Sequence, residues 1–247
     1  MTYKDSDQRT KDYLGKFTKD KVIQNLVGTD KPLILDIGGN IGQSVHRLKE
    51  VWEDCTIHSI EPLPEAFKRL HMCQALFSNV TAHNIALGSR NGKQDFYVSE
   101  HQPMLSSLYK LNKNSSDSIA INKPENAHKD FLKSKTIKVH VRTLDTFARQ
   151  NRIDSVDIIK MDAQGSEPDI LEHGKDTLKN TKIILTELSF YDLYTKKCSF
   201  YDIEKTLIPL GFELYDIAHI SKNPMNGRTD WADVIYFKKI KKSEKRC

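Results

Sequence analysis

Two acidic residues stand where short apolar runs of the chain give way to turns. Asp36 lies near the end of the run 33–37 and precedes a glycine-rich turn at 38–42, and Glu61 follows the run 56–60. Small residues let a backbone approach a ligand closely, and an acid beside them can face a cationic amino group or a sulfonium. An acid after the second strand can accept hydrogen bonds from both hydroxyls of an adenosine ribose. The pair predicts a site for an adenosine-containing ligand.

The turn 38–42 differs from the phosphate-binding turn of dinucleotide folds. Its acid precedes the glycines, and the third-glycine spacing of G-x-G-x-x-G is missing. S-adenosylmethionine has no phosphates to cradle, so the difference favours this ligand and argues against a dehydrogenase. The alternative is an ordinary α/β turn with a capping aspartate and an exposed glutamate.

Two further carboxylates are predicted at strand ends. Asp162 follows the apolar run 156–161, and Glu187 lies near the end of the run 182–188. Removal of a proton from a weakly nucleophilic hydroxyl by a positioned base contributes about 10²–10⁴-fold, so Asp162 is the candidate base and Glu187 a residue that positions it or the acceptor. There are two alternatives to these roles. Asp162 could cap a helix that follows its strand, and Glu187 could be a buried structural acid or an acid that only binds the acceptor. His140 and His173 are not placed at strand ends.

The elements that must position these acids alternate along the chain. Short apolar strands alternating with amphipathic helices predict a mostly parallel sheet with helices on both faces, and ligands bind at the carboxyl ends of such strands. A polar stretch at 100–134 is expected to leave the core, with 1–30 as an N-terminal extension, 31–240 as the main domain and 241–247 as a basic tail. The expected strands are 33–37, 56–60, 80–85, 94–99, 136–142, 156–161, 182–188, 212–220 and 232–238, and the expected helices are 41–51, 64–76, 143–150, 167–178 and 199–210.

Several separate motifs resemble the FkbM family of methyltransferases, in the order in which that family has them. The resemblance runs from about residue 33 to residue 237 and implies a class I methyltransferase fold of the Rossmann-like type, with a seven-stranded sheet whose last strand is antiparallel. It also implies O-methylation of sugars or other hydroxylated compounds. The matching motifs are Asp36-Ile-Gly-Gly-Asn-Ile-Gly-Gln43, Ile60-Glu61-Pro62 with Phe67, Asn84-Ile-Ala86-Leu87-Gly88, Leu144-Asp145 and Ile159-Lys160-Met161-Asp162-Ala-Gln164-Gly165-Ser-Glu167.

The resemblance assigns the cofactor, S-adenosylmethionine, to matching positions. The turn 38–42 with Asp36 is expected on the methionine side, Glu61 on the ribose, and residues 84–87 on the adenine side. The start of the helix after the turn is expected to reach the cofactor carboxylate with backbone N–H groups. The expected cofactor-binding residues are Asp36, Gly38, Gly39, Asn40, Gly42, Gln43, Ser44, Glu61, Pro62, Asn84, Ala86, Leu87 and Asp162.

The pocket for the acceptor is expected to be formed by the excursion and by the segments that follow the later strands. Many relatives have Glu where this chain has Gln164, which weakens that position as a base and argues against a carboxylate-bound metal; no metal is expected. The alternative for the serines of the excursion is an exposed loop without a binding role. The alternative for the aromatic residues after the fifth strand is that their rings pack under the last helix. The expected acceptor-binding residues are Ser106, Ser107, Gln164, Glu167, Phe190 and Tyr194.

Composition narrows the classes of partner. The net charge of the 247-residue chain is +5, and the segment 238–247 holds six Lys or Arg against one Glu, so the remaining body is neutral. A duplex-binding domain is expected to carry its basic stripe on the fold, which disfavours a nucleic-acid methyltransferase. No apolar run approaches about 18 residues, no signal peptide is evident, and four scattered cysteines indicate a reducing, cytoplasmic setting. A homodimer and a non-catalytic cofactor-binding scaffold for glycan assembly remain open.

Overall fold

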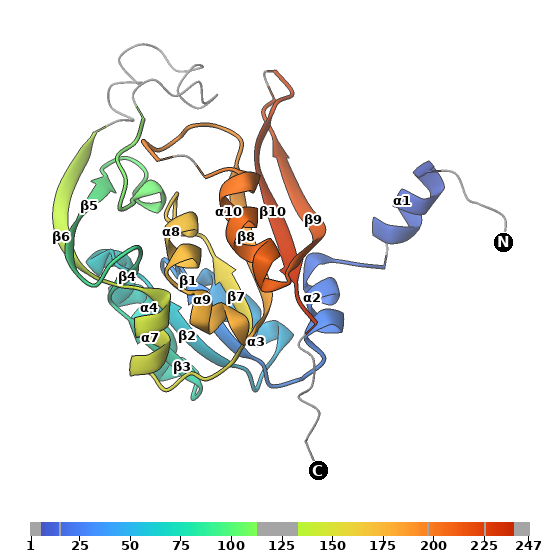
Figure 1. Cartoon of the computed structure of the whole chain (residues 1–247), viewed down its shortest axis with the longest axis horizontal. Helices are drawn as coiled ribbons and strands as arrows, with labels where there is room; N and C mark the ends of the chain where they lie inside the picture. The colour runs from blue at the N-terminus through green and yellow to red at the C-terminus, as the bar shows by residue number, and fades with distance from the viewer. Residues whose placement is uncertain (1–5, 15, 113–132, 197, 225, 240–247) are drawn as a thin grey trace.

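The computed structural model describes residues 6–14, 16–112, 133–196, 198–224 and 226–239, and its centre is a seven-stranded sheet (Figure 1). The strand order is β3-β2-β1-β7-β8-β10-β9. Strands β3, β2, β1, β7 and β8 pair in parallel, and β10 runs antiparallel to both β8 and β9. The expected sheet with an antiparallel last strand is confirmed. The strands are β1 (Leu33–Ile37), β2 (Thr56–Ile60), β3 (Val80–His83), β7 (Val156–Met161), β8 (Thr181–Ser189), β9 (Glu213–Lys222) and β10 (Thr229–Phe237).

Helices cover both faces of this sheet, as the alternating pattern predicts. One apolar cluster joins alternate residues of the strands to α7 (Leu144–Gln150), α8 (Glu167–Glu172), α9 (Lys175–Lys179) and α10 (Phe200–Leu207). The second cluster joins the other strand face to α2 (Lys19–Val27), α3 (Gln43–Val51) and α4 (Pro64–Leu76). Because successive strand residues point to opposite faces, Ile34 belongs to the second cluster and Leu35 to the first.

A smaller sheet stands beside the carboxyl ends of the parallel strands. It has the order β4-β6-β5 and is built from β4 (Ala86–Leu87), β5 (Gly92–Ser99) and β6 (Ser134–Arg142). Its inner face packs Ala86, Phe96 and Val141 against Leu63 and Ala66 at the start of α4. The expected excursion 100–134 leaves from β5 and returns at β6; its residues 113–132 lie outside the described residues, as does the expected tail 241–247. The short helix η1 (Pro103–Leu105) belongs to its first part.

Local backbone needs account for three differences from the expected elements. The expected helix 167–178 is two helices, α8 and α9, which meet at Gly174. A Cβ on Gly174 would lie 2.5 Å from Leu144 Cδ2, so the close packing of this junction on α7 requires glycine. The expected strand 80–85 ends as β3 at His83, and β4 of the smaller sheet begins only at Ala86. The expected helix 199–210 ends as the 3₁₀ helix η2 (Ile208–Leu210), stopped by Gly211 at φ 85°.

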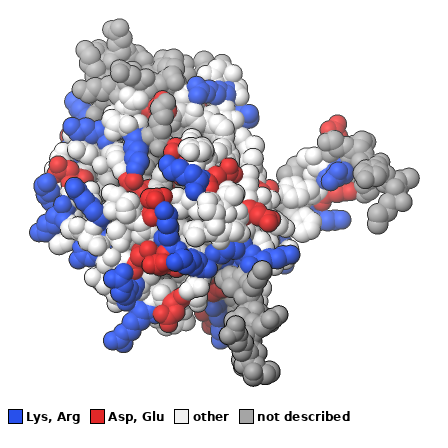
Figure 2. All heavy atoms as spheres, in the orientation of Figure 1, with Lys and Arg blue, Asp and Glu red and all other residues white. Residues whose placement is uncertain are grey.

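The helix α2 is integral to the core, although it lies within the expected extension 1–30. Its Val22, Ile23 and Val27 are buried in the second apolar cluster, and the Lys19 ammonium lies 2.6 Å from Asp233 on β10. The helix α1 (Ser6–Leu14), in contrast, projects from the body (Figure 1 and Figure 2). In the described part of the chain, none of the helices combines the length and apolarity needed to cross a membrane.

Replacement of Ile23 by alanine tests this integration. Ile23→Ala removes a buried side chain from the packed cluster and is expected to lower the free energy of unfolding by about 2–5 kcal/mol, measured by urea denaturation. The matched control is Asn25→Ala on the exposed side of the same helix, where a change within about 0.5 kcal/mol is expected. Equal effects of the two variants would show that α2 is only appended to the fold.

Candidate active site

A cavity opens at the carboxyl ends of β1, β2, β7 and β8, where the sequence places its candidate acids. Its volume is about 410 Å³, within the range of small-molecule sites, about 300–1,000 Å³. Glu61, Asp162 and Glu187 all line it. A second cavity of about 340 Å³ lies on the other side of the turn 38–40, with Gly38, Asn40, Asp162 and Glu187 shared between the two.

The turn between the two cavities is supported by a buried row of polar side chains. Asp36 lies in register with Ser59 on β2 and with Lys160 on β7. Its Oδ2 accepts hydrogen bonds from Ser59 Oγ at 2.6 Å and from Ser44 Oγ at 2.7 Å, and its Oδ1 lies 3.2 Å from Lys160 Nζ. Burial alone would lower the pKa of Lys160, but the nearby carboxylates of Asp36 and Asp162 raise it by more than burial lowers it. The net shift is upward, so the ammonium stays charged.

The Asp36 carboxylate therefore faces its protein partners and lines neither cavity. The expectation that it faces a cationic ligand group does not match this geometry. Lys160 extends the support, because its Nζ also donates to the Gly38 carbonyl at 3.0 Å. Ser59 and Lys160 were missed by the sequence analysis, although each is a polar residue within an apolar strand run, which is the signal that pointed to Asp36.

The turn itself requires glycine. The N–H groups of Gly38 and Gly39 both donate to the Ile60 carbonyl at 3.0 Å, which ties the end of β1 to the end of β2. Gly38 has φ 81°, and a Cβ at this position would lie 2.0 Å from the Asp162 carbonyl oxygen. The close approach of β1 and β7 behind the cavity depends on this missing side chain.

Glu61 lies at the cavity and is held by two backbone donors. Its Oε2 accepts the Asn40 N–H at 2.9 Å and its Oε1 accepts the Leu63 N–H at 2.7 Å. Burial raises the pKa of Glu61 to about 7. Each carboxylate oxygen can accept a further hydrogen bond, so both remain available to a pair of ligand hydroxyls.

The other residues expected to bind the cofactor lie at the large cavity, at the second cavity, or outside both. Pro62, Ala86 and Leu87 line the large cavity beside Glu61, and Gln43 and Ser44 line the second cavity. Asn84 lines neither; its exposed amide donates to the carbonyls of Glu61 and Pro62 at 2.9 and 3.2 Å. Gly39 borders the second cavity, and Gly42 caps the start of α3 at φ 99° without lining either.

Gln164 connects the candidate base to the wall of the cavity. Its Nε2 donates to Asp162 Oδ1 at 2.5 Å, and its Oε1 accepts the Tyr194 hydroxyl at 2.5 Å. An amide can serve both partners because it carries a donor and an acceptor, whereas an ionised glutamate here would face Asp162 with a like charge. Gln164 adopts φ 52°, a left-handed backbone that is uncommon outside glycine.

Glu187 and Glu167 lie near Asp162 in different surroundings. Burial, reinforced by Asp162 and Glu167, raises the pKa of Glu187 to about 8. Glu167 is almost fully buried, and its two oxygens accept the N–H groups of Ala163 and Gly165 at 2.7 and 2.9 Å. Its carboxyl shapes the loop after β7 from inside, in addition to lining the cavity.

The wall opposite the sheet, which we call the roof, consists of segments 103–112 and 191–196. Backbone bonds join Asn112 to Leu193 and Thr195 to Lys110 at 2.9 Å. Ser107 Oγ donates to the Gln164 carbonyl at 2.6 Å, and Ser106 Oγ accepts the Ser99 N–H at 3.1 Å. Both serine hydroxyls therefore hold the roof in place, and Ser106 also lines the cavity.

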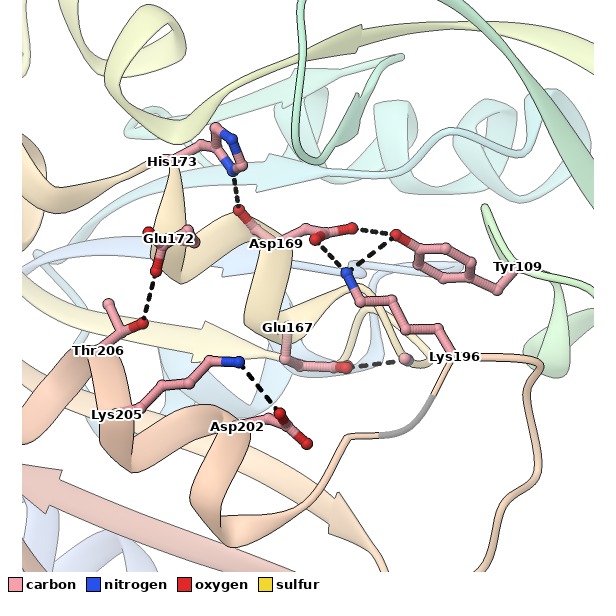
Figure 3. Close-up of polar contacts among 10 residues, drawn as sticks. Tyr109, Glu167, Asp169, Glu172, His173, Lys196, Asp202, Lys205 and Thr206 are labelled. Carbon is pink, nitrogen blue, oxygen red and sulfur yellow. Dashed lines mark hydrogen bonds and ion pairs between the residues drawn. The ribbon is translucent and has the colours of Figure 1, made fainter.

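A three-residue cluster fastens the outside of the roof to α8 (Figure 3). The Tyr109 hydroxyl and the Lys196 ammonium both donate to the Asp169 carboxylate. Lys196 Nζ also lies over the Tyr109 ring at 5.2 Å. Burial and the bond to Asp169 raise the pKa of Tyr109, so its hydroxyl stays protonated as the donor. The cluster fixes one roof segment to the other and to the body.

The two aromatic residues expected at the acceptor lie in different environments. Tyr194 is buried and lines the cavity, but Phe190 lies outside it, 40% exposed with its ring against Phe200. Ser189 ends β8 and lines the cavity, and Phe190 follows it directly where the chain leaves the strand. Tyr191, which belongs to the same aromatic segment, and Trp231 line the cavity instead; no sequence motif marked Trp231.

The sheet order, its single antiparallel strand and the cavity at the strand ends define a class I methyltransferase fold. The family model for the methyltransferase FkbM domain matches residues 36–214. The chain belongs to the FkbM methyltransferase family.

Relatives agree with this assignment. The chain is 30% identical over 175 residues to the 2-O-methyltransferase NoeI of Sinorhizobium fredii, covering 70% of this chain and 69% of that protein. It is 30% identical over 146 residues to Methyltransferase 1 of Beauveria bassiana, covering 58% of each. The crystal structure of methyltransferase FkbM from Methylobacillus flagellatus has a TM-score of 0.51 at 16% identity, over 84% of this chain and 44% of that chain. This chain thus spans less than half of that solved chain.

The raised pKa of Glu167 predicts a pH-dependent stability. Burial raises the pKa of Glu167 from 4.5 to about 7, so the folded protein retains a proton that the unfolded chain loses. The contribution of this proton is fully present below pH 4.5 and is lost as the pH rises through 7. The thermal midpoint of the wild type, relative to that of Glu167→Gln, is expected to fall by several degrees between pH 5 and pH 8, measured by calorimetry. A constant difference between the two proteins over this range would contradict the shift.

Proposed function

We propose that the protein transfers the methyl group of S-adenosylmethionine to a hydroxyl oxygen of a sugar or another hydroxylated small molecule. The observation that supports this best is the position of Asp162 between two differently built ends of one cavity. One side, after β2, holds Glu61 with apolar neighbours, and the other, beyond β7, holds Glu187, Tyr191 and Trp231. The 30% identity to a protein named as a 2-O-methyltransferase supports oxygen as the acceptor atom.

The Glu61 end of the cavity fits the nucleoside half of the cofactor. Two carboxylate oxygens with spare acceptor capacity stand beside the apolar side chains of Leu63, Ala86 and Leu87. A ribose diol pairs with the carboxylate, and an adenine ring buries its face against the apolar wall. Bound S-adenosylmethionine supplies the electrophilic methyl group.

The second cavity suits the amino-acid half of the cofactor. It is lined by the first turn of α3 and by Lys19, Arg47 and Lys160. The N–H groups at a helix start favour a carboxylate, and the cationic side chains of the lining add to this preference, although Lys19 is paired with Asp233 and Lys160 with Asp36. Asp233 in the same lining can face the ammonium group.

Asp162 is the base of this proposal, and Glu187 is a hydrogen-bond donor. Gln164 holds Asp162 through Oδ1 at 2.5 Å, which fixes the orientation of the carboxylate and leaves Oδ2 for an acceptor hydroxyl. Glu187, with its pKa raised to about 8, keeps its proton at neutral pH. A protonated Glu187 beside Asp162 can donate a hydrogen bond to the acceptor or to the base. Alignment of the acceptor oxygen with the methyl group supplies the rest of the catalysis.

Removal of the Glu61 carboxylate tests the ribose assignment. Glu61→Ala is expected to weaken S-adenosylhomocysteine binding by about 1.5–3 kcal/mol, the scale of hydrogen bonds to a charged group, measured by titration calorimetry. The control is Asn84→Ala, which perturbs the same backbone turn from outside the cavity. An equal loss in both variants, or unchanged affinity in Glu61→Ala, would rule out direct ribose binding.

Neutralisation of Asp162 tests the reaction itself. With methyl-labelled S-adenosylmethionine and a panel of deoxy-sugars and glycans, the wild type is expected to yield a methyl ether that mass spectrometry detects. Asp162→Asn is expected to lower kcat by about 10²–10⁴-fold while S-adenosylhomocysteine affinity changes little. Asp154→Asn, an exposed aspartate just before β7, is the control. Wild-type turnover in Asp162→Asn would exclude the base role, and no methyl ether from any member of the panel would overturn the proposed acceptor class.

A further inference from the structure

The end of the large cavity farthest from Glu61 has its own set of side chains. We call it the outer compartment; it is lined by Ser166, Ser189, Tyr191, Asp230 and Trp231. Trp231 on β10 pairs with Ser189 on β8, so the two side chains project from the same face of the sheet. The Phe190 N–H donates to the Asp230 carbonyl at 2.9 Å, which joins the two strands at the mouth of this compartment.

Two hydroxyl groups of the outer compartment have no hydrogen-bond partner in the part of the chain that the structure describes. The hydroxyl of Tyr191 and the Oγ of Ser166 are enclosed, and neither makes a hydrogen bond among the described residues. Tyr191 is 8% exposed and Ser166 is 2% exposed. Buried polar groups are nearly always paired, and an unpaired one costs about 1–3 kcal/mol. Two such groups lining one cavity point to a ligand that supplies the missing partners.

The surroundings hold Tyr191 in place without using its hydroxyl. The Arg228 guanidinium lies 4.1 Å from the centre of the Tyr191 ring and donates to the Phe190 carbonyl at 2.8 Å. Ser189 Oγ donates to the Tyr191 carbonyl at 3.1 Å. Ser166 stands at the start of α8, where a serine usually caps the helix, yet its hydroxyl makes no capping bond.

The charges around the large cavity are mostly acidic. Among the described residues that line it, the only cation is Lys196, which is paired with Asp169 outside the lining. An anionic acceptor would meet a lining with more acidic than basic side chains, in a partly buried site where repulsion between like charges is weakly screened. The acidic lining residues are Glu61, Asp162, Glu167, Glu187 and Asp230.

We propose that the outer compartment binds the acceptor through the hydroxyls of Tyr191 and Ser166, and that it selects uncharged, hydroxyl-rich rings over their anionic counterparts. Trp231 supplies an apolar surface for one face of such a ring, and the two hydroxyls bind its polar edge. This proposal rests on the proposed function, because it assigns the acceptor of the same site.

The test uses the full-length protein with S-adenosylhomocysteine and defined sugar probes. The probes are the methyl glycosides of glucose, galactose and 6-deoxygalactose, with the methyl glycosides of glucuronic and galacturonic acid as anionic counterparts. Binding is followed by saturation-transfer NMR, and thermal midpoints are measured in parallel. At least one neutral glycoside is expected to bind several-fold more tightly than the uronates. Equal or tighter binding of the uronates, or no binding of any neutral glycoside, would overturn the proposal.

Tyr191→Phe and Ser166→Ala each remove one of the unpartnered hydroxyls. Each variant is expected to weaken the best neutral probe about fivefold, which corresponds to the loss of one hydrogen bond of about 1 kcal/mol. The thermal midpoint should stay unchanged or rise, because a buried unpaired group is removed. Tyr201→Phe, which changes a 73% exposed tyrosine, is the control. Unchanged probe affinity, or a lowered midpoint that reveals a structural role, would contradict direct binding.

A separate titration distinguishes this proposal from the proposed function. If the wild type fails to bind S-adenosylhomocysteine, the proposed function fails, and the glycoside arms still report on the outer compartment. If the cofactor product binds normally and Tyr191→Phe binds the probes as the wild type does, only the assignment of the outer compartment fails.

Discussion

The row formed by Asp36, Ser59 and Lys160 is the constraint on which the rest of the site depends. It crosses the adjacent strands β2, β1 and β7 near their carboxyl ends, where the backbone leaves the sheet. The charge of Asp36 is compensated by two hydroxyls and an ammonium group, so that a buried carboxylate is tolerated. The same ammonium holds the Gly38 carbonyl, and the position of the turn in turn places Asn40 against Glu61.

A second chain of contacts runs from the base to the roof. Asp162 is bound by Gln164, Gln164 by Tyr194 and Ser107, and these two residues belong to the two segments of the roof. The orientation of the candidate base and the position of the roof therefore both depend on Gln164, through its side-chain amide and its backbone carbonyl. Glutamine in place of a second acid has a physical reason here, because a donor must face Asp162 and an acceptor must face Tyr194.

The sequence predicted the elements better than the direction of individual side chains. The alternation of apolar runs, with Glu61 and Asp162 at strand ends, located the central strands and the cavity, because strand ends converge at one edge. It did not reveal that Asp36 turns toward Ser59 and Lys160, since register between distant strands is not written in local spacing. Trp231 was missed for the same reason: β10 inserts between β8 and β9, and no motif near residue 231 signals that return. The smaller sheet arises from pairing across the excursion, which periodicity cannot show.

The roof is made of two segments that lie far apart in the chain but share backbone bonds, a hydroxyl–carbonyl contact and the Tyr109–Asp169–Lys196 cluster. A change of length or sequence in one segment leaves the other without its pairing partners. The two segments therefore behave as one unit, and a chimera that exchanges 103–112 must also exchange 191–196 to keep these bonds. The turn 38–42 and Glu61 lie outside this pair, so the roof can change in sequence while the Glu61 side of the cavity stays constant.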